Sequence, residues 1–143
     1  MPDSPKPFLL KSEELRVRLP LPPVQNHAYG ASATKSGRPF VFKRNVAKAW
    51  QTEATLLIRS ARQRKTLITT KVSVLVILYL THNRDIDSSH KLLLDTLEYA
   101  QVLKNDRQIF HLDTYKVYPS PEEGLLLEVR YVDPGAGTNE ITG

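Results

Sequence analysis

The sequence predicts a single small α/β (α+β) domain, with a mixed sheet of about four strands and two main helices on one face. Three observations predict this fold class. The chain of 143 residues is long enough for one hydrophobic core and too short for two. Two segments repeat apolar residues every three or four positions, as helices do. Four further segments are apolar or alternating and are bounded by turn-forming residues, in the overall order strand, helix, strand, helix, strand, strand.

The composition is that of a globular protein, with 41% hydrophobic and 24% charged residues. Cysteine is absent, which excludes a disulfide framework, a thiolate zinc site and a cysteine nucleophile, and favours a reducing compartment. The longest apolar run, Val72–Leu80, is too short to cross a bilayer, and the amino terminus lacks the pattern of a signal peptide. We therefore expect a cytoplasmic protein without a membrane partner.

The first half of the chain predicts one strand, one loop and one helix. Residues 1–14 contain three prolines and are expected to form a flexible leader, so the domain is expected to span 15–132. Leu15–Leu19 alternates like a half-buried strand, and the residues from 24 to 39 form a small-residue, basic loop that we expect to be mobile without a partner. Arg44–Arg64 predicts an amphipathic helix whose apolar stripe is Val46, Trp50, Ala54, Leu57 and Ala61.

The second half predicts three strands and one helix. Val72–Leu80 is apolar and β-branched enough for a buried strand, and Leu92–Leu103 predicts a helix with the apolar stripe Leu93, Leu97 and Ala100. Ile109–Tyr118 and Leu125–Val132 predict two strands joined by a hairpin-like turn. The tail, 133–143, is rich in glycine, threonine and asparagine and is expected to be disordered.

Acidic residues stand where the buried strand gives way to the second helix. In an extended segment, the two-residue repeat would point the carboxylates of Asp85 and Asp87 to one side, where a divalent cation would relieve their repulsion. With Asp106, just beyond the helix, they form a set of hard oxygen ligands suited to Mg²⁺ or Mn²⁺. The alternative is that these aspartates only cap and form turns. Zinc and EF-hand sites do not fit, because His90 has no neighbouring histidine and stands where an EF-hand loop needs glycine.

Positive charge gathers before and beside this acidic set. Ten basic residues lie between Lys35 and Lys71 against a single acid, Glu53, which favours a nucleic-acid partner over a merely solvated helix face. Lys91 stands early in the expected helix, where it opposes the helix dipole, so it either holds a scissile phosphate or pairs with Asp87 or Asp95. The residues expected to contact DNA are Lys35, Arg38, Lys43, Arg44, Lys48, Arg84 and Lys116.

Together these features indicate metal-assisted phosphodiester cleavage. The expected catalytic residues are Asp85, Asp87, Asp106 and Lys91, with the three aspartates as metal ligands and the lysine beside the phosphate. The residues alone do not name the nucleic acid.

Three stretches resemble the RusA family of Holliday junction resolvases: 19–26, 84–91 together with 94–97, and 105–109 followed by Lys116. The resemblance implies a small homodimeric endodeoxyribonuclease, encoded by a bacterium or a phage, that nicks two opposed strands of a four-way junction with Mg²⁺ or Mn²⁺. It places the family's metal ligands on the same three aspartates and its catalytic lysine on Lys91. Ser88 and Val24 depart from the family pattern, and Asp95 matches an acidic position that we rank as supporting the site.

Two alternatives to the activity implied by this resemblance remain open. One is a protein that binds DNA junctions without cutting them, and the other is a general metal-dependent nuclease acting on flaps or RNA. Paired, symmetric nicks in a four-way junction would distinguish the implied activity from both.

Overall fold

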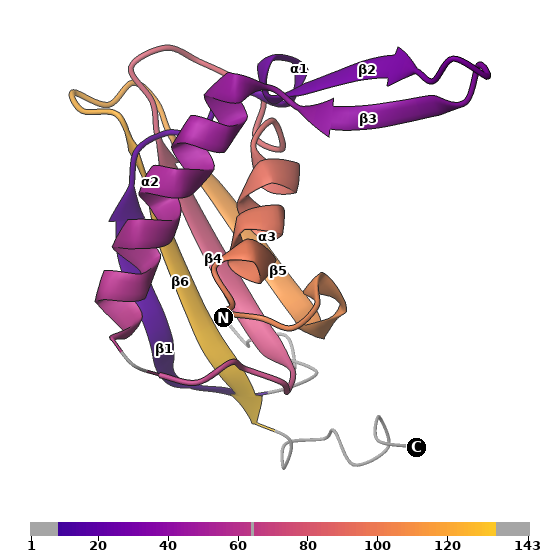
Figure 1. The fold of residues 1–143 in the computed structure, drawn as a ribbon. Coiled ribbons are helices and arrows are strands. Elements are labelled where there is room, and N and C mark those ends of the chain that lie inside the picture. Colours follow the sequence, from indigo (N-terminus) through magenta and orange to yellow (C-terminus); the bar gives the residue numbers. More distant parts are fainter. Residues whose placement is uncertain (1–8, 64, 134–143) are drawn as a thin grey trace.

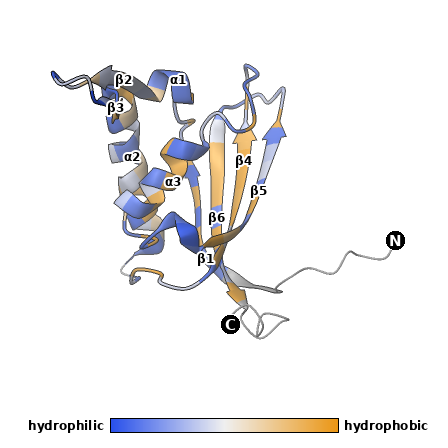
Figure 2. Ribbon diagram, turned by 90° about the vertical axis from the view of Figure 1, so that its right-hand side faces the viewer, coloured by the Kyte–Doolittle hydropathy of each residue, from blue (hydrophilic) through white to orange (hydrophobic). Residues whose placement is uncertain are grey.

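The computed structural model describes residues 9–63 and 65–133, and it confirms a mixed four-stranded sheet with two main helices on one face. The strands lie in the order β1-β6-β4-β5, with β4 and β5 parallel and the other pairs antiparallel. Figure 2 shows α2 and α3 together on one side of the sheet. The elements are β1 (Leu9–Leu19), α1 (Gln25–Ala28), β2 (Tyr29–Ala33), β3 (Pro39–Lys43), α2 (Asn45–Arg62), β4 (Val72–Tyr79), α3 (His90–Tyr99), η1 (Asp106–Gln108), β5 (Ile109–Val117) and β6 (Gly124–Asp133).

The core lies between β4 and the two helices. Alternate residues of β4, such as Val74 and Leu78, are almost fully buried, and α3 contributes Leu93 and Leu97, each with no exposed surface. Trp50 of α2 is also buried, and its indole Nε1 donates to the carbonyl oxygen of Pro20 at 2.9 Å. The expectation that this tryptophan packs in the core is therefore confirmed. Within the described ranges, no helix has the length and apolarity needed to cross a bilayer.

The apolar stripe expected for α2 is confirmed at Trp50 and Ala54 and is wrong at its other positions. Val46, Leu57 and Ala61 are exposed, while Ala47 and Ile58 are fully buried. The run from 56 to 58 is apolar throughout, so the sequence alone does not fix which of its residues faces the sheet. Neighbouring side chains on a helix point about 100° apart, and the packing of α2 on β1 determines which of them is buried.

The domain boundaries also need correction. The expected leader, 1–14, is wrong for residues 9–14, because β1 begins at Leu9 and pairs with β6 as far as the register Leu9–Asp133. A partner strand of sufficient length overrides the weak local preference of this segment. The rest of the leader, 1–8, and residues 134–143 of the expected tail lie outside the described residues.

The expected loop at 24–39 is wrong in a way that matters for function. It contains α1 and β2, and β2 pairs with β3 in an antiparallel hairpin with the register Gly30–Phe42 and Ser32–Phe40. Small residues on β2 lie opposite aromatic residues on β3. The sequence of β2 alone has no alternating apolar pattern that would predict a strand. The second helix is also shorter than expected, ending at Tyr99, because Gln101 adopts a positive φ of 60°.

Candidate functional site

Asp85 and Asp87 lie in the connection between the end of β4 and the start of α3, and both are exposed. The backbone there is not extended. The amide of Ser88 donates to the carbonyl oxygen of Asp85 at 3.1 Å, and that of His90 donates to the carbonyl oxygen of Asp87 at 3.3 Å. Asp85 and Asp87 therefore lie in consecutive turns. The expectation that an extended backbone points both carboxylates to one side does not apply.

Two basic side chains fasten this connection to the rest of the domain. Nη1 of Arg84 donates to the carbonyl oxygen of Pro22 at 2.6 Å and to Ser89 Oγ at 3.0 Å. Nζ of Lys116, on β5, donates to Asn83 Oδ1 and to the carbonyl oxygen of Arg84, both at 3.0 Å. Burial lowers the pKa of Arg84, against a smaller opposing effect of Glu123. Both residues position the loop that carries the aspartates, and their contact with DNA stays a prediction.

Asp106 lies at the opposite end of α3 from Asp85 and Asp87. It is exposed in η1, where the side chain of Asn105 accepts from the amide of Arg107 and that of Gln108 accepts from the amide of Asn105, both at 2.8 Å. The ten residues of α3 rise about 15 Å. This capped turn therefore holds the third carboxylate well away from the other two.

The three aspartates do not converge within the single chain described, so their sharing of one ion stays a prediction. Oxygen ligands of a single Mg²⁺ lie within about 4 Å of one another. In the ranges 9–63 and 65–133, no group of three His, Cys, Asp or Glu side chains is close enough to hold a metal ion. Asp85 and Asp87 remain as possible ligands at the β4–α3 connection. They fit the coordination of Mg²⁺, which usually binds one or two protein carboxylates together with waters and a substrate phosphate.

Lys91 lies one turn beyond the aspartates, exposed at the start of α3. Its Nζ lies 4.9 Å from the centroid of the Tyr29 ring, and none of the ion pairs found among the described residues includes it. The expected pairing with Asp87 or Asp95 is therefore replaced by a cation–π contact. The lysine is therefore exposed beside the aromatic ring, and no carboxylate of residues 9–63 or 65–133 forms an ion pair with it.

Tyr29 connects Lys91 with Asp95. Its hydroxyl donates to Asp95 Oδ2 at 2.5 Å, and burial, aided by this bond, raises the pKa of Tyr29 above its ordinary value. The carboxylate thus fixes the ring on which the lysine lies, which agrees with a supporting role for Asp95. Tyr29 is a residue that sequence reasoning missed, because its contacts join segments more than sixty residues apart.

The expected DNA-binding residues at 35–48 lie in and beside the β2–β3 hairpin. Lys35 and Arg38 stand in the connection between its strands. At its base, Arg44 Nε donates to the carbonyl oxygen of Tyr29 at 3.2 Å and Lys43 Nζ to Gln51 Oε1 at 3.5 Å, while Lys48 is exposed on α2. Because Tyr29 also contacts Lys91, the base of the hairpin adjoins the loop of Asp85 and Asp87. Phe40 and Phe42, exposed on β3, were missed.

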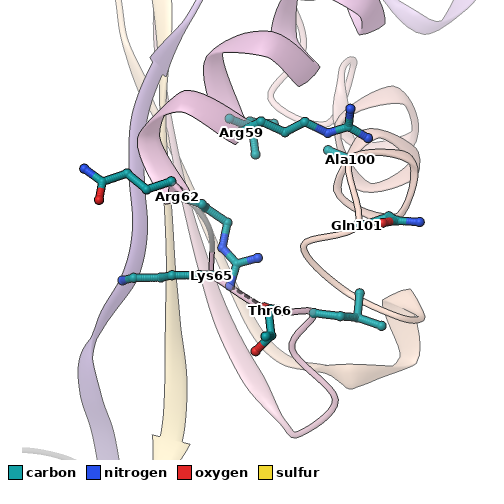
Figure 3. Close-up of a pocket in the computed structure, with 9 residues that line it drawn as sticks. Arg59, Arg62, Lys65, Thr66, Ala100 and Gln101 are labelled. Carbon is teal, nitrogen blue, oxygen red and sulfur yellow. Dashed lines mark hydrogen bonds between the residues drawn. The ribbon is translucent and has the colours of Figure 1, made fainter.

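A second basic region lies at the far ends of α2 and α3, around a cavity of about 400 Å³ (Figure 3). Arg59, Arg62 and Lys65 line it together with Gln101. Arg62 is only 4% exposed, and its Nη2 donates to the carbonyl oxygen of Thr66 at 2.9 Å. Basic residues in the last turn of a helix offset its dipole. This hydrogen bond gives Arg62 a structural role just beyond the end of α2, away from the aspartate pair.

Comparison with known proteins identifies the family. A family model described as "Endodeoxyribonuclease RusA" matches residues 20–130, which include Asp85, Asp87, Lys91 and Asp106. The chain belongs to the RusA family. The crossover junction endodeoxyribonuclease RusA of Aquifex aeolicus (strain VF5) is 39% identical over 59 residues, which are 41% of this chain and 47% of that protein. The chain therefore spans about half the length of the curated RusA relative that it matches, and the resemblance found in the sequence is confirmed.

Proposed function

We propose that this RusA-family protein is a divalent-metal-dependent endonuclease that resolves four-way DNA junctions by paired nicks in opposed strands. The observation that carries the proposal is the match of the family over the whole β4–α3 connection, where two exposed carboxylates and an unpaired lysine adjoin a basic hairpin. A protein acting on DNA in this way would work in the cytoplasm of a bacterium or of a phage-infected cell.

Each residue of the connection has a definite task in this proposal. Asp85 and Asp87 would hold Mg²⁺ or Mn²⁺, which supplies activation of water and stabilisation of the leaving oxygen when it is bound. Lys91, held over Tyr29, would contact the scissile phosphate and offset the charge that grows on it. Arg84 and Lys116 would keep the loop in place while the hairpin and α2 contact the DNA arms.

The separation of Asp106 from the other aspartates leads us to propose a homodimer with shared sites. A two-fold axis that sets the α3 helices of two chains antiparallel would bring the C-terminal end of one beside the N-terminal end of the other. Asp106 of the partner subunit would then join Asp85 and Asp87, and the symmetric arrangement gives two such sites. Two sites match a substrate that offers two equivalent strands.

The first experiment separates binding from cleavage. A four-way junction with each strand labelled in turn is incubated with wild type and with Asp87→Asn, in Mg²⁺. We expect symmetric nicks only with wild type and similar junction affinity for both proteins. A metal titration by thermal melting without DNA gives an independent readout, in which Mn²⁺ stabilises wild type more than the variant. If Asp87→Asn still cleaves the junction, the metal-binding role of Asp87 is refuted. If wild type does not cleave the junction, the result favours a protein that only binds junctions. If wild type cuts duplex DNA or RNA as fast as the junction, the result favours a general nuclease.

The second experiment tests whether sites are shared. Asp87→Asn and Asp106→Asn are purified separately and then mixed under conditions that exchange subunits. With shared sites, a mixed dimer contains one intact site, built from the unaltered Asp87 of one chain and the unaltered Asp106 of the other. We expect the mixture to recover nicking of single strands that neither variant shows alone. If both variants are inactive alone and also inactive when mixed as verified heterodimers, the carboxylates act within one chain.

A further inference from the structure

The β2–β3 hairpin is an arm that extends away from the sheet and helices (Figure 1). It consists of only two strands, Tyr29–Ala33 and Pro39–Lys43, which form a sheet of their own. An isolated two-stranded hairpin is marginally stable in water unless it packs against further structure. Its projecting part therefore gains little by folding alone and is well placed to gain by contact with a ligand.

The arm exposes aromatic and apolar surface. Phe40 and Phe42 are 45% and 40% exposed, with ring centroids 6.1 Å apart and ring planes at 46°. Residues two apart on a strand point to the same face, so the two phenyl rings share one face and Val41, 65% exposed, lies on the other. Exposed apolar surface gathered in one place is typical of a binding surface.

The strand opposite the rings leaves them uncovered. Phe42 pairs with Gly30 and Phe40 with Ser32, so β2 places no large side chain opposite either ring. At Gly30 an added Cβ would come 2.5 Å from a ring carbon of Phe42, so the ring occupies the space that only glycine leaves. The absence of a side chain at position 30 thus sets where Phe42 lies.

Charge on and around the arm selects an anionic partner. Lys35 and Arg38 lie in the turn and Arg44 at the base, where its guanidinium carbon is 5.8 Å from the centroid of the Phe42 ring. The sequence has no aspartate or glutamate between Glu14 and Glu53. A partner that is anionic and also offers flat apolar faces is nucleic acid with unstacked bases. A linear duplex hides its base faces, whereas a branch point exposes them.

We propose that Phe40 and Phe42 stack on bases exposed at the branch point, and that this contact distinguishes a junction from linear duplex. The inference rests on the proposed DNA-junction function and assigns to the arm a part in substrate selection. The basic residues of the arm contact phosphates, which both kinds of DNA present equally. The phenyl rings contact base faces, which the junction presents preferentially.

The test compares two substrates of the same sequence, a four-way junction and a linear duplex, at one salt concentration. The full chain carrying Phe40→Ala and Phe42→Ala together is measured beside Val41→Ala, a matched control on the opposite face of the same strand. Loss of base–aromatic stacking at one or two bases weakens binding by about 10- to 100-fold. We expect a loss of this size for the junction, less than about a threefold change for the duplex, and wild-type affinities for Val41→Ala.

Additional readouts make each outcome decisive. Arg38→Gln is expected to weaken junction and duplex alike and to lower the salt dependence of both. Melting temperature and dimer mass of the double variant should match wild type. The stacking role is overturned if the double variant loses affinity equally for both substrates or if its junction affinity is unchanged. It is also overturned if the dimer dissociates, which would instead indicate that the phenylalanines form a contact between subunits. A selective loss of junction affinity in a protein that cuts no DNA supports the stacking role and refutes only the proposed nuclease function.

Discussion

The bond between Tyr29 and Asp95 offers a quantitative test of how Lys91, the proposed catalytic lysine, is positioned. Replacing Tyr29 with phenylalanine removes only the hydroxyl, so the ring beneath Lys91 is kept. A hydrogen bond to a charged group contributes roughly 1.5–3 kcal/mol to stability when well protected. This 2.5 Å bond is only partly buried, so we expect Tyr29→Phe to lower the free energy of unfolding by about 1–2 kcal/mol. For a chain of this length, that is a fall in melting temperature of roughly 3–8 °C.

A double-mutant cycle assigns the effect to the pair. Urea unfolding of wild type, Tyr29→Phe, Asp95→Asn and the double variant should give a coupling energy of about 1 kcal/mol. Junction cleavage adds a functional readout: Tyr29→Phe should keep most activity, while Tyr29→Leu, which also removes the ring face under Lys91, should lose about tenfold or more. Tyr99→Phe on exposed α3 surface is the matched control, with a change within about 0.5 kcal/mol. Additive single effects, or equal cleavage by the phenylalanine and leucine variants, would refute this account.

Three further predictions follow from individual contacts. Leu97 has no exposed surface, so Leu97→Ala should destabilise by about 2–5 kcal/mol in urea unfolding, whereas Leu56→Ala, at a position 65% exposed, should stay within about 0.5 kcal/mol. The pKa of Tyr29 is raised mainly by burial, so its hydroxyl keeps its proton at a pH where the unfolded chain releases it. The stability difference between wild type and Tyr29→Phe should therefore be constant from neutral pH to about pH 9 and shrink above about pH 10. Lys116→Met removes two hydrogen bonds to the loop before Asp85. The variant should cleave the junction more slowly, while its free energy of unfolding should change by less than about 1 kcal/mol. An unchanged cleavage rate would contradict the role of Lys116 in holding the loop.

The fold was predictable where one periodicity dominated. The β-branched run of β4 and the spacing of Leu93 and Leu97 lead directly to a buried strand and a covering helix, and the structure confirms both. Prediction failed where pairing with a distant segment decides the conformation. The start of β1 at Leu9 depends on β6, more than a hundred residues away, and the hairpin depends on small residues finding aromatic partners across it.

The sequence predicted which residues belong to the candidate site, but it did not predict how their side chains are arranged in space. The family and the place of Asp85 and Asp87 between β4 and α3 followed from motif order. The relation of Lys91 to Tyr29, and of Tyr29 to Asp95, did not, because side chains from α3 and β2 meet only in the folded domain. Spacing along the chain placed Asp106 beyond the helix, but it could not show that this carboxylate lies away from the other two.

The length of α3 is what makes a single chain insufficient for a three-carboxylate site. The helix is packed on the sheet through Leu93 and Leu97, so it cannot shorten or tilt enough to bring η1 to the β4–α3 loop without opening the core. A capping box holds Asp106 in η1, and two fastening side chains hold the loop of Asp85 and Asp87. The two sets of carboxylates are thus held at opposite ends of α3, whose ten residues span about 15 Å. If Asp106 takes part in the same reaction as Asp85 and Asp87, it must act in the site of a second chain, and the subunit-mixing experiment decides this directly.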